Sequence, residues 1–443
     1  MTGGRGEYDA ARVTEVEGRE LMRKRPGLYI GSTGVGGLHQ LVYEVASRSV
    51  NEVLTGGGGC VDVTLTRDGG IRIADDGPGI PFEAAGEVRV GDGLETLLTR
   101  PETELRPDGR NTVRWSVYGM GPCAATVMSS RLTAEVRRGG VRRVQEYARG
   151  VALVPPVTAG PATDTGTTIA FWPDPGIFDT VECSFAVPAG RVREVALLNR
   201  GLTLSLTDER PAGGTRSVSF RYPDGAADFV ALLDAETERV LPEVIAFEWE
   251  DERMAGIAEV ALSWRSAREE RVRSFANSAP TPEGGTHEDG FRTGVAAALT
   301  EHALRHGLLK PGGPGLGADR VGEGLTAVVS VRLDRPEYDG STRGRLGGGS
   351  HRERRRRAGG SGTPRQLAGP PPGTGGGRHR AHHQGHGPGR ELIDRRAPAA
   401  DAVPRPPGTR ARHRAPGDGR LRPRCRRPGG PRGCRPCPAR SSP

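Results

Sequence analysis

The chain has little of several features that would place it in a membrane or outside the cell. No apolar run among its 443 residues reaches the roughly 18 residues that a spanning helix needs. The N-terminus lacks the apolar stretch of a secretory signal. These absences predict a cytoplasmic protein without a membrane partner.

Positive charge is unevenly distributed and comes almost entirely from arginine. Residues 347–443 contain 23 arginines, no lysine and five acidic residues, a net charge of about +18. Because the whole chain carries +9, residues 1–346 carry about −9. The basic character that would suggest a nucleic-acid partner therefore belongs to the C-terminal segment alone.

Residues 347–443 are rich in Arg, Pro and Gly and contain almost no large aliphatic residue. Such a segment cannot bury enough apolar surface to offset its chain entropy, so we predict that it is disordered. The interpretation we favour is a frameshift or gene truncation, because a GC-rich gene read out of frame gives this composition. One alternative is a basic tail that binds DNA phosphates non-specifically. The other is a zinc site at Cys434 and Cys437, with Cys425 and His413 nearby.

The remaining cysteines, Cys60, Cys123 and Cys183, are scattered, which suits reduced thiols in a cytosol. The periodicity of residues 1–346 predicts an α+β fold with helices over mixed sheets and a break near residue 222. Helical spacing of apolar residues predicts helices over 38–55, 189–201, 226–242 and 290–307. Strands are predicted over 61–65, 71–75, 131–138, 141–148, 166–173, 202–206, 260–265, 271–278 and 325–333.

Two short motifs precede and follow the first predicted helix. RKRPGLYIG occupies residues 23–31, and ADDGPGIP occupies residues 74–81. In the second motif a strand ends in the carboxylate of Asp75, and Gly77 and Gly79 then let the backbone come close to a ligand. Taken singly, the first run is compatible with an ordinary basic turn and the second with a plain turn.

Taken together, these motifs resemble the B subunits of type IIA DNA topoisomerases, gyrase B and topoisomerase IV B. Further matches follow in the family's order: TGTTIAFWP (165–173), EGGTHEDGFR (283–292), EGLTAVVSVRL (323–333) and PEYDGSTRGRLG (336–347). The resemblance implies an N-terminal dimerisation arm over 1–22 and a GHKL (Bergerat) ATPase sandwich over 23–221. A ribosomal-protein-S5-like transducer domain would follow over 222–346, before the tail.

The resemblance also implies a function. It predicts an ATP-binding B-type subunit that couples ATP binding and hydrolysis to changes in DNA topology, with ATP and Mg²⁺ as cofactors. The implied partners are a second B-type chain in a homodimer or heterodimer, a gyrase A-type subunit and DNA. Nothing after residue 347 resembles the metal-binding cleavage domain of a complete B-type chain.

Site residues can be carried over from the family position by position. Glu44 takes the place of the general base for the attacking water. Asp75 would accept the adenine amine, Thr167 would lie beside the base, and Tyr8 on the arm would touch the partner's nucleotide. The nucleotide-binding set implied by the resemblance is Tyr8, Arg48, Asp75, Gly77, Gly79, Ile80, Gly119, Gly121, Thr167 and Arg343.

The chain departs from the family where phosphate and metal should be held. Arg48, one turn after Glu44, replaces an asparagine that binds Mg²⁺, and a guanidinium cannot ligate a metal. Trp115 and Ser116 replace two glycines of the phosphate loop, and the bulk of Trp115 is expected to hinder its closure. Arg343 replaces the transducer lysine. We therefore predict no metal ligand at position 48. A non-catalytic gyrase-B-like paralogue, which binds nucleotide or partner subunits without turnover, is the alternative to an active ATPase.

Overall fold

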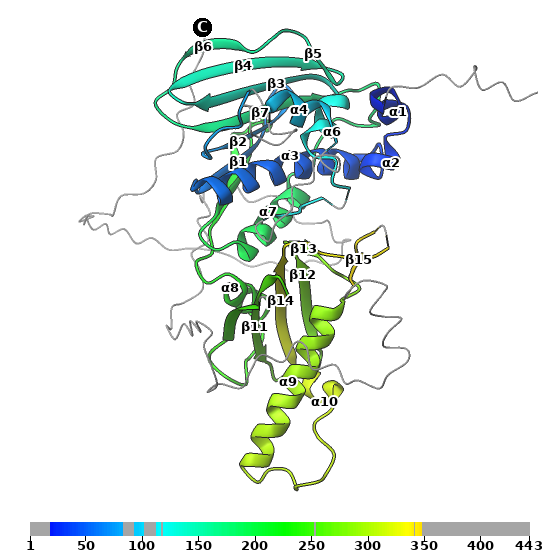
Figure 1. The fold of residues 1–443 in the computed structure, drawn as a ribbon, viewed down its shortest axis with the longest axis vertical. Coiled ribbons are helices and arrows are strands. Elements are labelled where there is room, and N and C mark those ends of the chain that lie inside the picture. Colours follow the sequence, from blue (N-terminus) through cyan, green and yellow to red (C-terminus); the bar gives the residue numbers. More distant parts are fainter. Residues whose placement is uncertain are drawn as a thin grey trace, which may run out of the picture. The chain divides into compact units, whose positions relative to one another are not determined.

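The larger of two main β-sheets is built from residues 60–220 (Figure 1). The computed structural model describes residues 18–82, 93–101, 112–116, 118–251, 254–340 and 342–347. The strands of this sheet are β1 (Cys60–Leu65), β2 (Ile71–Asp75), β3 (Ser129–Arg138), β4 (Val141–Ala148), β5 (Val151–Ala152), β6 (Val157–Pro161), β7 (Gly166–Pro173), β8 (Thr203–Asp208) and β9 (Arg216–Phe220). Their order is β5-β4-β3-β7-β2-β1-β8-β9, with β6 beside β4. Among the described strands of this sheet, β1 and β8 pair in parallel and the other neighbours are antiparallel.

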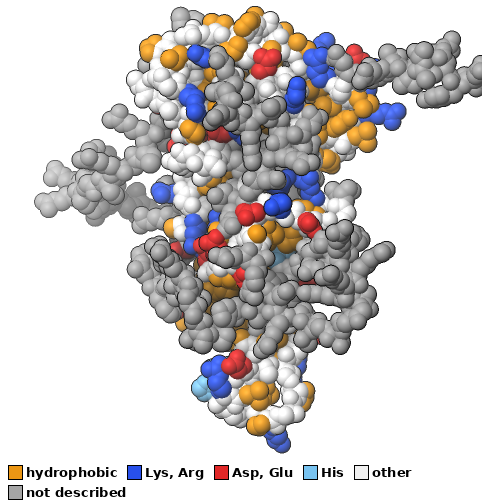
Figure 2. All heavy atoms as spheres, viewed as in Figure 1, with side chains coloured by type: hydrophobic (Ala, Val, Ile, Leu, Met, Phe, Trp, Pro, Cys, Tyr) orange, Lys and Arg blue, Asp and Glu red, His pale blue; other side chains and the backbone are white. Residues whose placement is uncertain are grey.

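Helices cover this sheet and supply much of the core. They are α1 (Gly18–Lys24), α2 (Gly27–Ile30), α3 (Val35–Gly56), α4 (Leu94–Thr99), α6 (Pro122–Val127) and α7 (Ala186–Leu198). The apolar stripe of α3, which includes Leu38, Leu41 and Val45, is completely buried, as its helical spacing predicts. The helix ends where Gly57 adopts a left-handed φ of 81° and its N–H bonds the carbonyl of Val53. Hydrophobic side chains are also visible at the surface over the β4–β6 end of the sheet, where Val154 and Val157 are exposed (Figure 2).

The second sheet lies in residues 245–333 (Figure 1). Its strands are β10 (Ile245–Asp251), β11 (Gly256–Trp264), β12 (Arg271–Ala276), β13 (Ala279–Pro280) and β14 (Leu325–Leu333), in the order β10-β11-β14-β12-β13. The accompanying helices are α8 (Ala226–Leu233), α9 (Thr286–Arg305) and α10 (Ala318–Gly322). A small hairpin of β15 (Tyr338–Asp339) and β16 (Arg345–Leu346) follows β14.

The predicted helix over 226–242 is too long. The helix ends at Leu233, because the next residue, Asp234, turns its buried carboxylate toward the second sheet. Its oxygens accept hydrogen bonds from the hydroxyls of Ser263 on β11 and Thr326 on β14, the latter at 2.7 Å. Anchoring this carboxylate takes the chain out of the helical path, and a turn-rich segment leads from there to β10. The other predicted helices and strands are confirmed, with shifts of a few residues at their ends.

One hydrophobic core continues from the larger sheet into the second. Ala261, Phe275 and Val328 of the second sheet belong to the same cluster of buried side chains as α3, α7 and the strands of the first. The rings of Phe229 on α8 and Phe275 lie 5.8 Å apart. All described residues fall within a single unit spanning residues 1–395.

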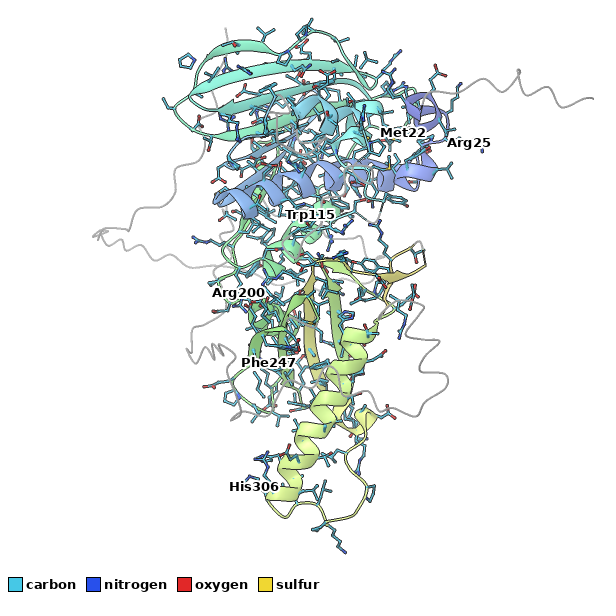
Figure 3. The ribbon with its side chains drawn as sticks, in the orientation of Figure 1. Met22, Arg25, Trp115, Arg200, Phe247 and His306 are labelled. Atoms are coloured by element: carbon cyan, nitrogen blue, oxygen red, sulfur yellow. The ribbon has the colours of Figure 1, made fainter. Side chains whose placement is uncertain are left out.

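Polar contacts accompany this shared core. Arg200, seen in Figure 3, donates to Glu259 on β11 at 2.8 Å. Asn199 bonds the hydroxyl of Ser278 at 3.1 Å. Within the described part of the chain, no helix is both long and apolar enough to cross a bilayer.

The described residues do not reach two of the predicted regions. Tyr8 and most of the predicted arm lie outside them. So does the predicted disordered tail beyond Gly347.

Candidate functional site

Asp75 is a buried carboxylate at the end of β2. Its Oδ1 accepts the N–H groups of Thr167 at 3.0 Å and Gly77 at 3.2 Å, whereas its Oδ2 has no hydrogen-bond partner among the described residues. Burial raises the pKa of Asp75 to about 6, although the Ser49 hydroxyl and the two N–H groups lower it in part, and the charge of Glu52 raises it further. One oxygen of a carboxylate that is only 5% exposed is therefore left to accept a donor.

The loop after β2 folds back onto β7, the antiparallel neighbour of β2. The N–H of Ile80 donates to the Thr167 hydroxyl at 3.1 Å, so Thr167 contacts the loop at its side chain and Asp75 at its backbone. Gly79 has a φ of 80°, and a Cβ there would stand 2.6 Å from the carbonyl oxygen of Arg137. A side chain does not fit at this position, and the glycine permits the close approach of the backbone.

Glu44 lies near the middle of α3 and is 1% exposed. Its Oε1 accepts the Ser116 hydroxyl at 2.7 Å and the N–H of Met120 at 3.1 Å, and its Oε2 accepts the N–H of Gly121 at 2.7 Å. Gly119 and Gly121 have left-handed φ values of 64° and 67°. These turns aim successive backbone N–H groups at the carboxylate, so both oxygens of Glu44 are occupied by donors of the chain.

Residues 112–116 run along the face of α3 that carries Glu44. Three side chains of α3 hold this segment. Asn51 bonds the backbone N and O of Val113 at 2.7 and 3.2 Å. The Ser47 hydroxyl accepts the N–H of Trp115 at 3.0 Å, and Oε1 of Gln40 accepts the Ser116 hydroxyl at 3.1 Å. Positions 40, 44, 47 and 51 share one helical face because they are three or four residues apart. The segment is therefore fastened to α3 on both sides of the glutamate.

Trp115 lies within this segment, beside α3 (Figure 3). Its side chain is 4% exposed, and its ring meets that of Tyr43 edge-on at 6.2 Å. The indole fills space in the hydrophobic core, which gives the bulk at position 115 a packing role. The expected hindrance to closure of the loop stays a prediction.

Arg48 stands one turn after Glu44 on α3. Its guanidinium forms an ion pair with Glu52, a further turn along, and both side chains are largely buried. In the described ranges, no three His, Cys, Asp or Glu side chains gather as they would around a metal ion. The guanidinium of Arg48 cannot ligate a metal, so this side chain does not fit a Mg²⁺ ion.

Arg343 lies in the loop between β15 and β16, in a left-handed conformation with a φ of 55°. Burial lowers the pKa of Arg343, as does the positive charge of Arg114, while Tyr338 and the carboxylate of Glu44 raise it. The charge of Glu44 therefore contributes to the environment of Arg343, and a position of Arg343 at the terminal phosphate stays a prediction.

The structure brings the predicted site residues into two groups. Hydrogen bonds and short loops join Asp75, Gly77, Gly79, Ile80 and Thr167 into one, and Glu44 forms the other with the loop that carries Gly119 and Gly121. The charge of Glu52, which pairs with Arg48, raises the pKa of Asp75, so the Arg48–Glu52 pair lies close to the first group.

Sequence reasoning missed four polar residues of α3: Gln40, Ser47, Ser49 and Asn51. For Gln40, Ser47 and Asn51, the spacing on the helical face of Glu44 was the available signal.

This strand order, with a buried carboxylate at the end of β2 and a glutamate on the long helix, defines a GHKL-type ATPase fold joined to a transducer. The family model for DNA gyrase B matches residues 225–356. The DNA gyrase B protein of Streptomyces coelicolor is 39% identical over 357 residues, covering 77% of this chain and 52% of the relative. The 43K ATPase domain of Thermus thermophilus gyrase B, solved with an aminocoumarin, superposes with a TM-score of 0.64 at 30% identity, covering 77% of this chain and 86% of that chain. The chain belongs to the DNA gyrase B family.

The DNA gyrase B protein of Mycobacterium tuberculosis is 35% identical over 375 residues, covering 77% of this chain and 54% of the relative. The chain thus spans about half the length of the curated relatives that it matches.

Proposed function

We propose that this chain is the ATP-binding part of a B-type subunit of a type II DNA topoisomerase, and that Asp75 accepts the exocyclic amine of adenine. The observation that carries the proposal is the buried Oδ2 of Asp75, which accepts no hydrogen bond from the residues that the structure describes. A buried acceptor without a donor costs free energy unless a ligand satisfies it. The glycines at 77 and 79 keep bulky side chains away from the loop beside it.

The other residues divide the work of holding ATP. Thr167 fixes the wall beside Asp75. The N–H groups of Met120 and Gly121 would have to leave Glu44 before they could bind phosphate oxygens. Arg343 supplies a positive charge for the terminal phosphate. ATP supplies the phosphoanhydride whose binding and hydrolysis drive strand passage in a complete enzyme. Because the guanidinium of Arg48 cannot ligate a metal and pairs with the carboxylate of Glu52, Mg²⁺ is not part of the proposed site.

Partners follow from family membership and are part of the same proposal. They are a second B-type chain joined through the ATPase half, a gyrase A-type subunit and DNA, in the cytoplasm.

A second candidate function is a paralogue that binds nucleotide or partner subunits without turnover. It is favoured by the three hydrogen bonds that Glu44 accepts, because each donor stabilises the ionised carboxylate and so weakens it as a base for the proton of the attacking water. The Ser116 hydroxyl and the Arg48–Glu52 ion pair both arise at positions where this chain differs from the residues expected for the family. Both changes act on hydrolysis while leaving the Asp75 pocket intact.

Calorimetric titration of ATP into the full chain, together with steady-state hydrolysis, tests the proposal. ATP should bind, and Asp75→Ala should weaken binding roughly tenfold or more. Failure of the parent chain to bind ATP would overturn the assignment.

Turnover separates the two candidate functions. If hydrolysis is blocked at Glu44, the double variant Ser116→Gly, Arg48→Asn should hydrolyse ATP at least roughly tenfold faster than the parent. Arg320→Asn, which removes an exposed arginine of α10, is the matched control for loss of charge. Efficient turnover by the parent, abolished by Glu44→Gln, would exclude the paralogue that lacks turnover.

A further inference from the structure

The loop that carries Arg343 is fastened at its base to the start of α9. The backbone contacts are Glu283 N–H to Gly344 O at 2.9 Å and Leu346 N–H to Gly284 O at 3.0 Å, and the Thr286 hydroxyl donates to Gly347 O at 3.0 Å. Gly285 and Leu346 also form a parallel β-bridge. The two segments are about 60 residues apart in the chain, yet they run together as a short ribbon.

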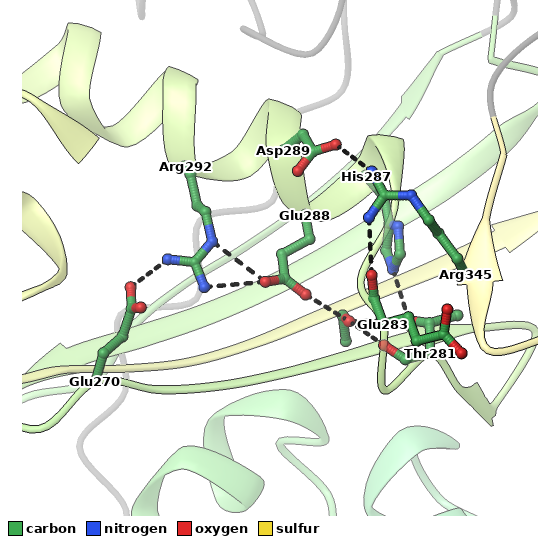
Figure 4. A network of polar contacts seen from close by, with 9 residues as sticks. Glu270, Thr281, Glu283, His287, Glu288, Asp289, Arg292 and Arg345 are labelled. Atoms are coloured by element: carbon green, nitrogen blue, oxygen red, sulfur yellow. Dashed lines mark hydrogen bonds and ion pairs between the residues drawn. The ribbon is translucent and has the colours of Figure 1, made fainter. Parts of the chain in front are cut away.

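Arg345 adds side-chain contacts to this ribbon (Figure 4). Its Nη1 donates to the carbonyl oxygen of Glu283 at 2.8 Å, and its Nη2 donates to Oδ2 of Asp289 at 3.0 Å. Asp289 lies in the first turn of α9, where a negative charge is favourable. One guanidinium thus joins the loop, the turn before α9 and the helix itself.

The two segments approach so closely that glycine is required at the contact. A Cβ on Gly285, whose φ is 142°, would stand 2.3 Å from the carbonyl oxygen of Leu346. A Cβ on Gly344 would stand 2.7 Å from Oε1 of Glu283, a flexible side-chain end that can move aside, so the requirement for glycine lies at Gly285. Neither segment can shift against the other without breaking several hydrogen bonds, so the base of the loop and the start of α9 move together.

The start of α9 is in turn fixed to the second sheet (Figure 4). Glu288 accepts the hydroxyl of Ser274 on β12 at 2.8 Å. Arg292 donates to Glu288 at 3.0 Å and also pairs with Glu270. A continuous series of contacts therefore runs from β12 through α9 and Arg345 to the loop of Arg343.

We propose that Arg345 is a positioning residue that holds Arg343 in reach of the terminal phosphate of a bound nucleoside triphosphate, through its contacts with Glu283 and Asp289. The inference rests on the proposed function and deepens it. In this proposal the EGGTHEDGFR segment, residues 283–292, holds the loop of Arg343 in place. Loss of Arg345 leaves the Asp75 pocket intact and lowers the contribution of Arg343 to phosphate binding.

The test compares nucleotide affinities of the full chain with Arg345→Ala. We expect binding of a non-hydrolysable ATP analogue to weaken roughly fivefold while the affinity for ADP stays unchanged, because the loss is confined to the terminal phosphate. Arg345→Lys, which keeps a donor and the charge, should recover part of the loss. Arg305→Ala is the matched control, since Arg305 forms a surface ion pair with Glu301 at the other end of α9, the helix that carries Asp289.

Amide hydrogen exchange without nucleotide provides a second measurement. Exchange at Glu283 and Leu346 should speed up in Arg345→Ala and stay unchanged in Arg305→Ala. Unchanged exchange, or equal losses for ATP analogue and ADP, would overturn the inference. If the parent binds no nucleotide but exchange still speeds up in Arg345→Ala, the proposed function and the phosphate role of Arg345 both fail. In that case only the conclusion that Arg345 holds the loop against the start of α9 remains.

Discussion

Replacing Asp75 with asparagine should stabilise the protein while destroying its nucleotide site. Asparagine keeps an oxygen for the N–H groups of Thr167 and Gly77. It puts an NH₂ group where Oδ2 now stands, and that group opposes the adenine amine, donor against donor. Binding of ATP should therefore weaken roughly tenfold or more.

The gain in stability follows from the raised pKa of Asp75. Burial lifts it from 3.8 to about 6, so the ionised form is disfavoured in the folded protein. The folded protein favours the neutral form of Asp75 more strongly than the unfolded chain does. This preference stabilises the folded protein fully below pH 3.8, and the stabilisation is lost as the pH rises through about 6. About two pKa units correspond to about 3 kcal/mol. The stability of Asp75→Asn relative to the parent should therefore rise by about 3 kcal/mol between pH 4 and pH 8.

Denaturant unfolding at a series of pH values, with ATP titration at pH 8, measures both effects. Asp76→Asn is the matched control: Asp76 is the exposed neighbour, whose Oδ1 accepts the N–H groups of Gly59 and Cys60. The control should show no comparable change in relative stability over this range. The reasoning fails if the stability of Asp75→Asn relative to the parent does not change with pH, or if the variant binds ATP like the parent.

Three further predictions concern the second sheet. Burial lowers the pKa of His287 to about 4, so its contribution to stability is present above pH 6.5 and is lost as pH falls toward 4. His287→Gln should therefore reduce the loss of unfolding free energy on acidification by up to about 3 kcal/mol, and an unchanged acid-unfolding curve would contradict this. Gly285→Ala should cost roughly 2 kcal/mol or more in denaturant unfolding, because of its φ and the nearby Leu346 carbonyl, whereas Gly190→Ala in α7 should stabilise slightly. Phe275→Ala, at a fully buried ring, should cost about 3 to 5 kcal/mol, whereas Phe247→Ala, at a ring that is 41% exposed, should cost much less; equal costs would refute the burial argument.

The sequence predicted the elements whose periodicity is strong. The apolar stripe of α3 and the alternating residues of β3 and β7 depend on neighbours within one element, and their positions are confirmed. The helix predicted over 226–242 failed at Asp234, where bonds to β11 and β14 override local preference. The division into domains near residue 222 stays a prediction.

The candidate site could be predicted only in part, for a similar reason. The Arg48–Glu52 pair follows from i,i+4 spacing and can be read locally. The bond between Ser116 and Glu44 joins residues 72 positions apart, and no spacing rule identifies it. The role proposed for Arg345 depends on a ribbon between segments that are far apart in sequence, so local sequence patterns could not predict it.

The hydrophobic core that continues from one sheet into the other limits how this gene can be rearranged. A chain stopped after β9 would keep every strand of the larger sheet, but it would expose to water the side chains that Ala261, Phe275 and Val328 now cover. Such a fragment should be prone to aggregation. Grafting a relative's second half onto this first half would require matching side chains on both sides of the junction. Recombination within the family should therefore tolerate crossovers in surface loops better than at this junction.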